Sequence, residues 1–276
     1  MHSALIQAVQ EKDYDLIEHF IKHGADPNFR DGMSVVTAAR QSNIKSLHLL
    51  ARSKPTWEVY SHAFAVVPRG IDRWHQQPDI VQTLDNIFIS GGANGPAVDE
   101  TLVVALISSH ASAAKFVGMI LSCKTVLDIN FDGGRSLCIA VKRALFELVR
   151  YFLSLKPNDK TLRTAFMAIF ESNANERILI SMLHTFFEHS KLAKHLYFQQ
   201  DDPLNNPLYQ TLHRHPDKPD MLQTLLDHGC RTGSKFSWTF DSKIGPEEVS
   251  PLLWLLCQGD EGIESRTVKT LLAHAC

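Results

Sequence analysis

The sequence has no long apolar stretch, and its cysteines form no recognisable pairs. No run of about 18 apolar residues occurs in the 276-residue chain, which speaks against a membrane span. A disulfide framework or a structural zinc site would show paired cysteine spacing such as C-x-x-C, and none is present. We therefore expect reduced cysteines in or near the core of an intracellular protein. The five cysteines are Cys123, Cys138, Cys230, Cys257 and Cys276.

The sequence also lacks a strong charge of either sign and a recognisable leader. Lys and Arg number 28 and Asp and Glu 30, so the formal net charge is −2 (28 − 30). This balance supplies no basic field for nucleic acid or an acidic membrane surface, and we expect neither as a partner. The N-terminal stretch MHSALIQAVQEKDYD has no basic region followed by an apolar core, so it is unlike a signal peptide. We expect a cytoplasmic protein. The alternatives are a nuclear protein and a secreted protein whose signal peptide has been removed, because a mature secreted chain would have the same kind of N-terminus.

Motifs for phosphate binding, nucleophilic catalysis and metal binding are missing. The patterns G-x-x-x-x-G-K-[ST], G-x-G-x-x-G and G-x-S-x-G do not occur. The tightest histidine pair is HRH at 213–215, and His184 with His189 is the next, but neither has a carboxylate or cysteine at ligand spacing. We interpret HRH as a solvated helix end. We expect no metal, no cofactor and no catalytic residue.

Helical periodicity is what the sequence does contain, and residues 3–28 show its unit. Leu5, Ala8 and Val9 lie on one face of a short helix, a polar turn EKDYD follows, and apolar residues then recur at helical spacing. Gly24 is the expected end of the second helix, because a left-handed residue there needs no side chain. Pro27 prevents continuation of that helix. The unit is therefore helix, turn, helix and a Gly-Pro-Asn exit.

The same unit recurs along the chain. Further copies occupy 34–55, 100–121, 136–157, 207–231 and 250–275, with weaker ones at 58–94 and 159–189. A small or central residue marks the middle of each first helix: Ala8, Ala38, Ala65, Ala105, Ala140, Ala165 or Ala168, Thr211 and Leu255. From 8 to 255 is 247 residues over seven intervals, or about 35 each, and a helix-turn-helix period near 33 is typical of ankyrin repeats.

Several short stretches carry a resemblance to that family. SPLLWLL (250–256) and NPLYQTL (206–212) are similar to the family's T-P-L-H-x-A-A motif. GADPN (24–28) and GGAN (91–94) are similar to its helix ending, and HGCR (228–231) keeps the start of that ending. NFRDG (28–32) and NFDGG (130–134) are similar to its connecting finger. No copy has the histidine of the motif, which in the family ties neighbouring repeats together. The resemblance implies an all-α, ankyrin-like solenoid of about eight helix-turn-helix repeats with short finger loops.

The resemblance also implies a domain organisation. We expect one repeat array over residues 1–276, without a domain boundary. The approximate repeats are 3–32, 33–56, 57–95, 98–132, 135–158, 159–200, 205–245 and 249–276.

Fingers and irregular loops supply the candidate contact residues. Phe29 and Arg30 lie in the first expected finger and Phe131 in a later one. PRGIDRWHQQP (68–78) interrupts the third repeat and is either a recognition loop or a variable surface loop with its tryptophan packed on its own repeat. Its candidate residues are Arg69, Arg73, Trp74 and His75.

An aromatic segment precedes the last repeat. Phe236, Trp238 and Phe240 alternate with Ser237 and Thr239, which is the period of a strand. The aromatic side chains either form an exposed binding face or fold back and seal the end of the array.

Three functions are compatible with this sequence. The leading hypothesis is a protein-interaction module, a scaffold or adaptor that binds a protein partner of unknown identity through fingers and first helices. The alternatives are a small-ligand-binding or catalytic protein with a pocket beneath the long loops, and the recognition part of a larger signalling or ubiquitin-ligase assembly. The C-terminal helix, with Val268, Leu271 and Leu272, also suggests contact or self-association at that end.

Overall fold

The computed structural model describes residues 1–67, 69, 84–108, 111–122, 127–189, 205–230, 236–238, 247–250 and 265–274. The chain divides into two compact units, Met1–Phe131 and Asp132–Cys276. Helices dominate the described residues of both, which confirms the expected all-α class. The described part contains one sheet, in which β1 (Phe236–Trp238) pairs antiparallel with β2 (Glu247–Val249). None of the helices in these ranges combines the length and apolarity needed to cross a membrane.

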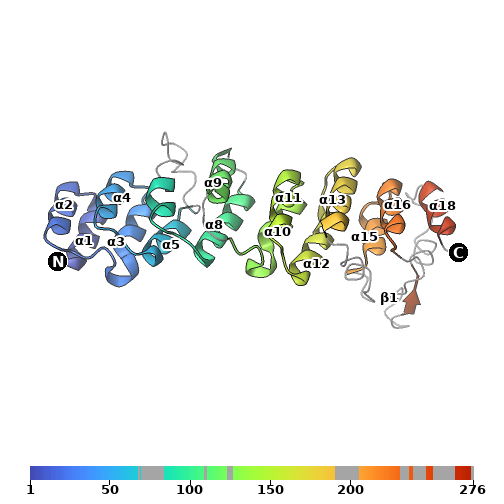
Figure 1. The fold of residues 1–276 in the computed structure, drawn as a ribbon, viewed down its shortest axis with the longest axis horizontal. Coiled ribbons are helices and arrows are strands. Elements are labelled where there is room, and N and C mark those ends of the chain that lie inside the picture. Colours follow the sequence, from blue (N-terminus) through green and yellow to red (C-terminus); the bar gives the residue numbers. More distant parts are fainter. Residues whose placement is uncertain are drawn as a thin grey trace. The chain divides into compact units, whose positions relative to one another are not determined.

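Helix pairs build the N-terminal unit (Figure 1). The pairs are α1 (His2–Glu11) with α2 (Tyr14–Lys22), α3 (Phe29–Arg40) with α4 (Ile44–Ala51), α5 (Trp57–Ala65) with the π-helical η2 (Asp85–Ile89), and α8 (Pro96–Ile107) with α9 (Ala111–Ser122). The first helices pack in succession, α1 on α3, α3 on α5 and α5 on α8, while α2 packs on α4. Each pair thus buries its apolar face against its neighbours.

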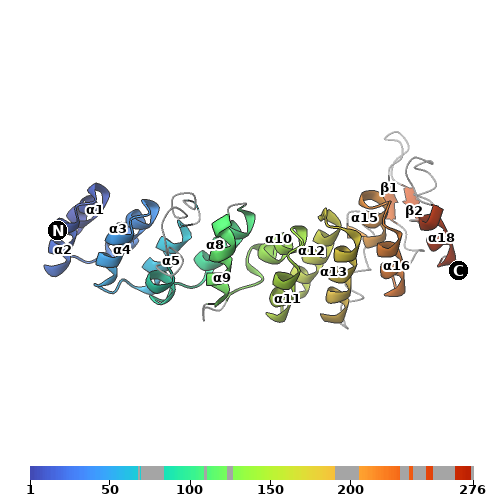
Figure 2. The same ribbon diagram turned by 90° about the horizontal axis from the view of Figure 1, so that it is seen from above.

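The C-terminal unit repeats this plan. Its elements are α10 (Arg135–Lys142), α11 (Phe146–Ser154), α12 (Asp159–Met167), η4 (Ala168–Glu171), α13 (Glu176–His189), α15 (Pro207–Arg214), α16 (Pro219–Asp227) and α18 (Ser265–Ala273). A 3₁₀ turn, η3 (Phe131–Gly133), precedes α10. In Figure 2, α10 and α12 lie in one row and α11 and α13 in another, and the members of each row are in contact. Farther along, α13 packs on α16 and α16 on α18.

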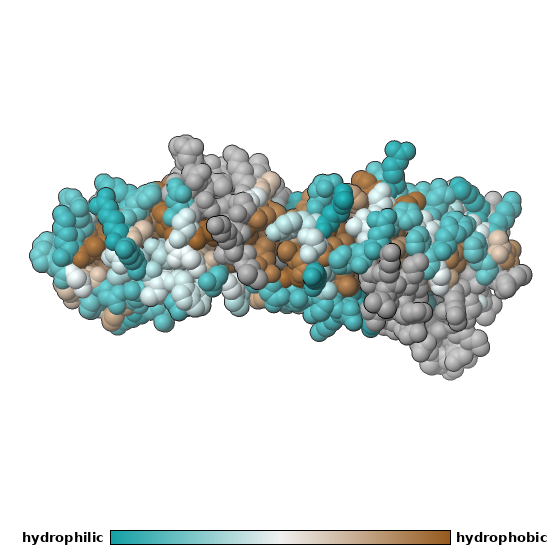
Figure 3. Space-filling model, viewed as in Figure 1, coloured by the Kyte–Doolittle hydropathy of each residue, from teal (hydrophilic) through white to brown (hydrophobic). Residues whose placement is uncertain are grey.

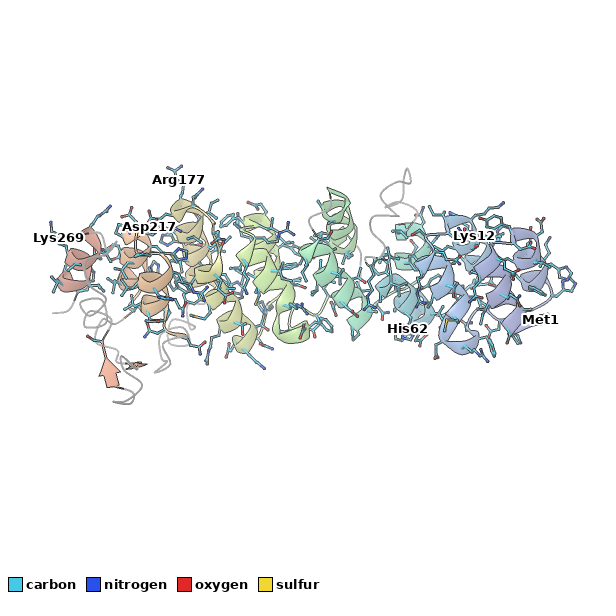
Figure 4. The ribbon with its side chains drawn as sticks, turned by 180° about the vertical axis from the view of Figure 1, so that it is seen from behind. Met1, Lys12, His62, Arg177, Asp217 and Lys269 are labelled. Atoms are coloured by element: carbon cyan, nitrogen blue, oxygen red, sulfur yellow. The ribbon has the colours of Figure 1, made fainter. Side chains whose placement is uncertain are left out.

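The turn inside a helix pair has the same backbone in three places. Ala8, Ala38 and Ala140 each accept a 2.9 Å hydrogen bond from the N–H five residues later, and the residue before that donor is left-handed. These left-handed residues are Lys12, Ser42 and Ala144, with φ of 59°, 54° and 55°; Lys12 is labelled in Figure 4. The three alanines are buried, as are Ala105, Ala165 and Ala168. The expected small residue at this position is confirmed there.

In α5 the expected register of the small residue is wrong. Ala65, which the spacing selects, is partly exposed, and Ala63 is the fully buried alanine of that helix. No glycine ending precedes α5, so the loop before this helix is shorter than the loop before α3. A constant repeat length therefore selects Ala65, which is half a helical turn beyond the buried Ala63. Leu255, the last member of the expected series, lies outside the described residues.

Three second helices end in the same glycine motif. Gly24, Gly92 and Gly229 have φ of 81°, 92° and 96°. The next residue in each case is buried and small (Ala25, Ala93 or Cys230), and its N–H donates to the carbonyl five residues back at 2.9, 2.9 and 3.0 Å. This is the Schellman arrangement, in which a left-handed glycine lets the chain cap its own helix. The glycine endings expected from GADPN, GGAN and HGCR are confirmed.

Residues 26–65 and 128–167 align without a gap at a shift of 102 residues (128 − 26). The lysine before a proline is left-handed in both copies, Lys54 with φ 51° and Lys156 with φ 57°. Phe64 and Phe166 are both fully buried and contact further buried phenylalanines, Phe88 at 5.6 Å and Phe170 at 5.7 Å between ring centroids. The identical pairs are Asp26/Asp128, Asn28/Asn130, Phe29/Phe131, Gly32/Gly134, Ser34/Ser136, Ala38/Ala140, Lys54/Lys156, Pro55/Pro157, Ala63/Ala165 and Phe64/Phe166.

Candidate functional site

The expected fingers are compact left-handed turns. In the first loop, residues 26–32, the Asp26 carboxylate accepts hydrogen bonds at 2.9 Å from the N–H and the side-chain amide of Asn28. Arg30, Asp31 and Gly32 are then left-handed in succession, with φ of 52°, 54° and 73°. A short side-chain oxygen that mimics a backbone turn explains why aspartate begins this loop. The regular part of α3 begins only after Gly32.

Two contacts hold the first loop against the start of α5. The Asn28 Oδ1 atom accepts a hydrogen bond of 2.8 Å from the Thr56 N–H, just before α5 begins. Gly32 lies against Val59, so closely that a methyl group on Gly32 would stand 2.9 Å from Val59 Cβ. On its other side the loop is tied to α1, because the Asp26 N–H donates to His2 Nδ1 at 2.9 Å. The loop is therefore held by the first helices before and after it.

The second loop, residues 128–134, is built in the same way. Asp128 accepts a hydrogen bond of 2.9 Å from the Asn130 N–H, and Asp132, Gly133 and Gly134 have positive φ. Gly134 lies against Thr161 of α12, as Gly32 lies against Val59. The Asp128 N–H donates to the buried Asp99 carboxylate of α8 at 3.1 Å.

Asp99, whose carboxylate accepts the hydrogen bond from the second loop, has a raised pKa. Burial raises the pKa of Asp99 to about 6, more than the hydrogen bond from Asp128 lowers it, and the charge of Asp128 raises it further. The link between α8 and this loop is therefore sensitive to pH in the mildly acidic range.

The structure brings Phe29 and Arg30 together on the first loop. The Phe29 ring is half-buried, stacks on the His2 ring at 5.3 Å between centroids, and carries the Arg30 guanidinium 5.3 Å from its centre. Arg30 is exposed. Phe131 occupies the equivalent position in the second loop and is half-buried as well.

Sequence reasoning missed two exposed apolar side chains in the segments that the first loop and the start of α5 contribute. Trp57 and Met33 leave 49 % and 42 % of their surface exposed. Asp31, in the loop, and Glu58, next to Trp57 in sequence, are also exposed. The exposure of Trp57 could have been predicted from the sequence. Trp57 lies outside the apolar face of α5, which is formed by Val59, Tyr60, Ala63 and Phe64. The face in Figure 3 is mostly hydrophilic over α1–α4.

The other candidate contact residues are not brought to the first loop by any described contact. Arg69 is exposed and its guanidinium forms an ion pair of 2.8 Å with Glu100 of α8. Phe236 and Trp238 lie in β1, which confirms the strand period for that stretch. Arg73, Trp74, His75 and Phe240 lie outside the described residues.

The interpretation of HRH as a solvated helix end is wrong for its last histidine. His213 and Arg214 are exposed, but His215 is only 6 % exposed. Its Nε2 lies 3.0 Å from the carbonyl oxygen of Phe170 in the preceding repeat, and its Nδ1 lies 3.0 Å from Lys218 Nζ. Burial lowers the pKa of His215, and the Lys218 charge lowers it further. A histidine thus ties neighbouring repeats, from a position outside the family motif.

The titratable groups of the described residues form no recognisable metal centre. Within these ranges, no group of three or more His, Cys, Asp or Glu side chains is placed to hold a metal ion. Two cysteines are described, the partly buried Cys138 and the buried Cys230. Burial raises the pKa of the Cys138 thiol to about 11, so it is protonated and a poor nucleophile at neutral pH.

Comparison with known proteins identifies one stretch of the chain. The family model described as Ankyrin repeat matches residues 2–32, which are α1, α2 and the first loop up to Gly32. The resemblance to ankyrin repeats is thereby confirmed for this stretch. No curated protein and no solved structure gives a significant match to the chain.

Proposed function

We propose that this chain is a protein-interaction module, a scaffold or adaptor without catalysis, which binds a protein partner in the cytoplasm through its loops and first helices. The ankyrin match at residues 2–32 supports this proposal, because such repeats generally bind proteins. The proposal includes a single solenoid array of about eight repeats over residues 1–276.

The observation that carries the proposal comes from comparing residues 26–65 with residues 128–167. The two segments share their structural residues but differ in the side chains that they expose. Identical residues occupy the turns, the close contacts and the core, such as Gly32/Gly134 and Ala38/Ala140. The half-buried Phe29 has Phe131 as its equivalent, but the exposed positions around it differ. They are Arg30/Asp132, Asp31/Gly133, Met33/Arg135, Trp57/Asp159 and Glu58/Lys160. A constant framework that presents different side chains at one edge is suited to binding partners by surface complementarity.

Site-specific photo-crosslinking tests this proposal. A photoreactive amino acid at Asp31, on the edge, should capture a discrete partner from a lysate of the source cells, identified by mass spectrometry. The same amino acid at Asp15, an exposed residue in the first turn of α2, is the matched control and should capture less of that partner. Equal capture at both positions, or capture only at Asp15, would contradict binding through the loops.

Contact at the C-terminal end is a second part of the proposal. In α18, Leu271 is buried while Leu272 is 52 % exposed. If this end self-associates, the full chain should show a concentration-dependent mass in light scattering, and Leu272→Glu should abolish it. A constant monomer mass for the unmodified chain would contradict self-association at the C-terminal end. It would not affect the proposal that a partner binds through the loops.

A further inference from the structure

One group in the N-terminal unit, exposed except for the half-buried Phe29, combines apolar and acidic side chains, and we call it the edge patch. Its members are Phe29, Arg30, Asp31, Met33, Trp57 and Glu58. The contacts Asn28–Thr56 and Gly32–Val59 bracket all of them except Met33, which directly follows Gly32. Residues 29–31 lie between Asn28 and Gly32, and residues 57 and 58 lie between Thr56 and Val59. The patch is therefore assembled by the fold from two segments that are far apart in sequence.

The patch has an incomplete charge balance. Asp31 and Glu58 are exposed carboxylates that form no hydrogen bond or ion pair with any of the described residues. The one cation, Arg30, lies over the Phe29 ring. Glu58 is adjacent in sequence to the exposed indole of Trp57, and Asp31 lies in the loop that Asn28 joins to Thr56. A cation at this edge is attracted by the charge of the carboxylates and by the ring face. The same carboxylates repel phosphate, which disfavours a nucleic acid.

The equivalent positions in the C-terminal unit form no such site. Asp132 is paired with Arg135 at 3.1 Å. Asp159 stands in place of Trp57, and Lys160 in place of Glu58. Asp132, Arg135, Asp159 and Lys160 carry two positive and two negative charges, and the one apolar equivalent is the half-buried Phe131. The two backbones match, so the difference lies in the side chains.

We propose that the edge patch binds an extended peptide segment of a partner protein in which a Lys or Arg stands next to an apolar residue. The basic side chain stacks on Trp57 and pairs with Asp31 or Glu58, while the apolar residue covers Met33. This inference rests on the proposed function as an interaction module and specifies the chemistry of its partner.

Peptide selection on the full chain tests the chemistry directly. A phage library of random dodecapeptides is selected on the unmodified protein, with counter-selection on the Trp57→Asp/Glu58→Lys double variant, which carries the residues of the second copy. We expect the enriched peptides to contain Lys or Arg beside an apolar residue. A representative synthetic peptide should bind the double variant about tenfold more weakly or worse, as truncated hot spots do. Higher salt should weaken its binding to the unmodified protein.

Other outcomes overturn the proposal. Enrichment of acidic or purely apolar peptides would do so, as would no enrichment, or equal affinity for the unmodified protein and the double variant. Thermal melting by circular dichroism checks that the double variant is folded, and Glu58→Gln is a milder second variant that should still weaken binding severalfold.

The two proposals fail separately. If photo-crosslinking at Asp31 captures a partner while peptide selection shows no basic preference, the interaction module stands and the peptide chemistry is wrong. If crosslinking at Asp31 fails as well, both are wrong.

Discussion

Gly32 lies directly against Val59, although 27 residues separate them (59 − 32), and Gly134 lies against Thr161 at the same separation (161 − 134). Both glycines are left-handed, and both touch the first helix of the following repeat. The missing side chain thus serves two purposes, since it permits a positive φ and lets two repeats approach.

Gly133 and Gly134, adjacent in the second loop, allow the effect of a positive φ to be measured apart from the effect of close packing. A methyl group on Gly134 would stand 3.0 Å from Thr161 Cβ, whereas one on Gly133 meets nothing within 4 Å, and both residues have positive φ, 80° and 67°. Gly133→Ala should lose stability from backbone strain alone, and Gly134→Ala should lose about 1–3 kcal/mol more from overpacking. Urea denaturation of both variants measures the difference. Equal losses would mean that the contact with Thr161 is not tight.

Ala140 tests the packing inside a helix pair. It is fully buried and its carbonyl caps the turn to α11. Ala140→Leu should destabilise the protein by about 1–3 kcal/mol, because the added atoms have no space. Ala273→Leu, the same change at an exposed position of α18, is the control and should have little effect. An unchanged melting temperature for Ala140→Leu would contradict the close approach.

Asp99 should make stability depend on pH in the acidic range. Its pKa in the folded protein, about 6, lies above the ordinary value of 3.8, so the folded state holds this proton more tightly. The resulting stabilisation is complete below about pH 4 and is lost as the pH rises through about 6. Asp99→Asn keeps an oxygen that can accept from the Asp128 N–H but does not titrate.

The test compares this variant with the unmodified protein at two pH values. Asp99→Asn should gain relative stability between pH 4 and pH 7, measured by urea denaturation. A stability difference that is the same at both pH values would show that Asp99 does not titrate differently on folding.

His215 should act in the opposite direction. Its pKa in the folded protein is lowered from 6.5 by burial and by Lys218, so its contribution is present above about pH 6.5 and is lost as the pH falls through the lowered value. His215→Gln removes the titrating ring, and the stability advantage of the unmodified protein over this variant should shrink on acidification. His213→Gln, at an exposed position of the same motif, should leave the acid dependence unchanged. The opposite ranking of the two variants would contradict the burial of His215.

The local features of this protein were determined by the sequence alone. The helices, the glycine endings at Gly24, Gly92 and Gly229, and the small residues Ala8, Ala38 and Ala140 follow from interactions within a few residues of the chain. Their recurrence also carried the resemblance to ankyrin repeats. Among the described residues, the spacing failed in α5, where the buried small residue is Ala63 and not Ala65.

The edge patch and the ties between repeats were decided by the tertiary structure. The segment that begins α5 lies against the first loop because Asn28 Oδ1 accepts the Thr56 N–H, and His215 is buried where its Nε2 lies against the Phe170 carbonyl oxygen. Such pairs are separated by one repeat or more, and their proximity depends on how each helix pair rotates onto the next. A sequence window covers one helix and shows which face is apolar. It does not show which polar or aromatic residue at the margin of that face stays in solvent, because that is decided by the neighbouring repeat.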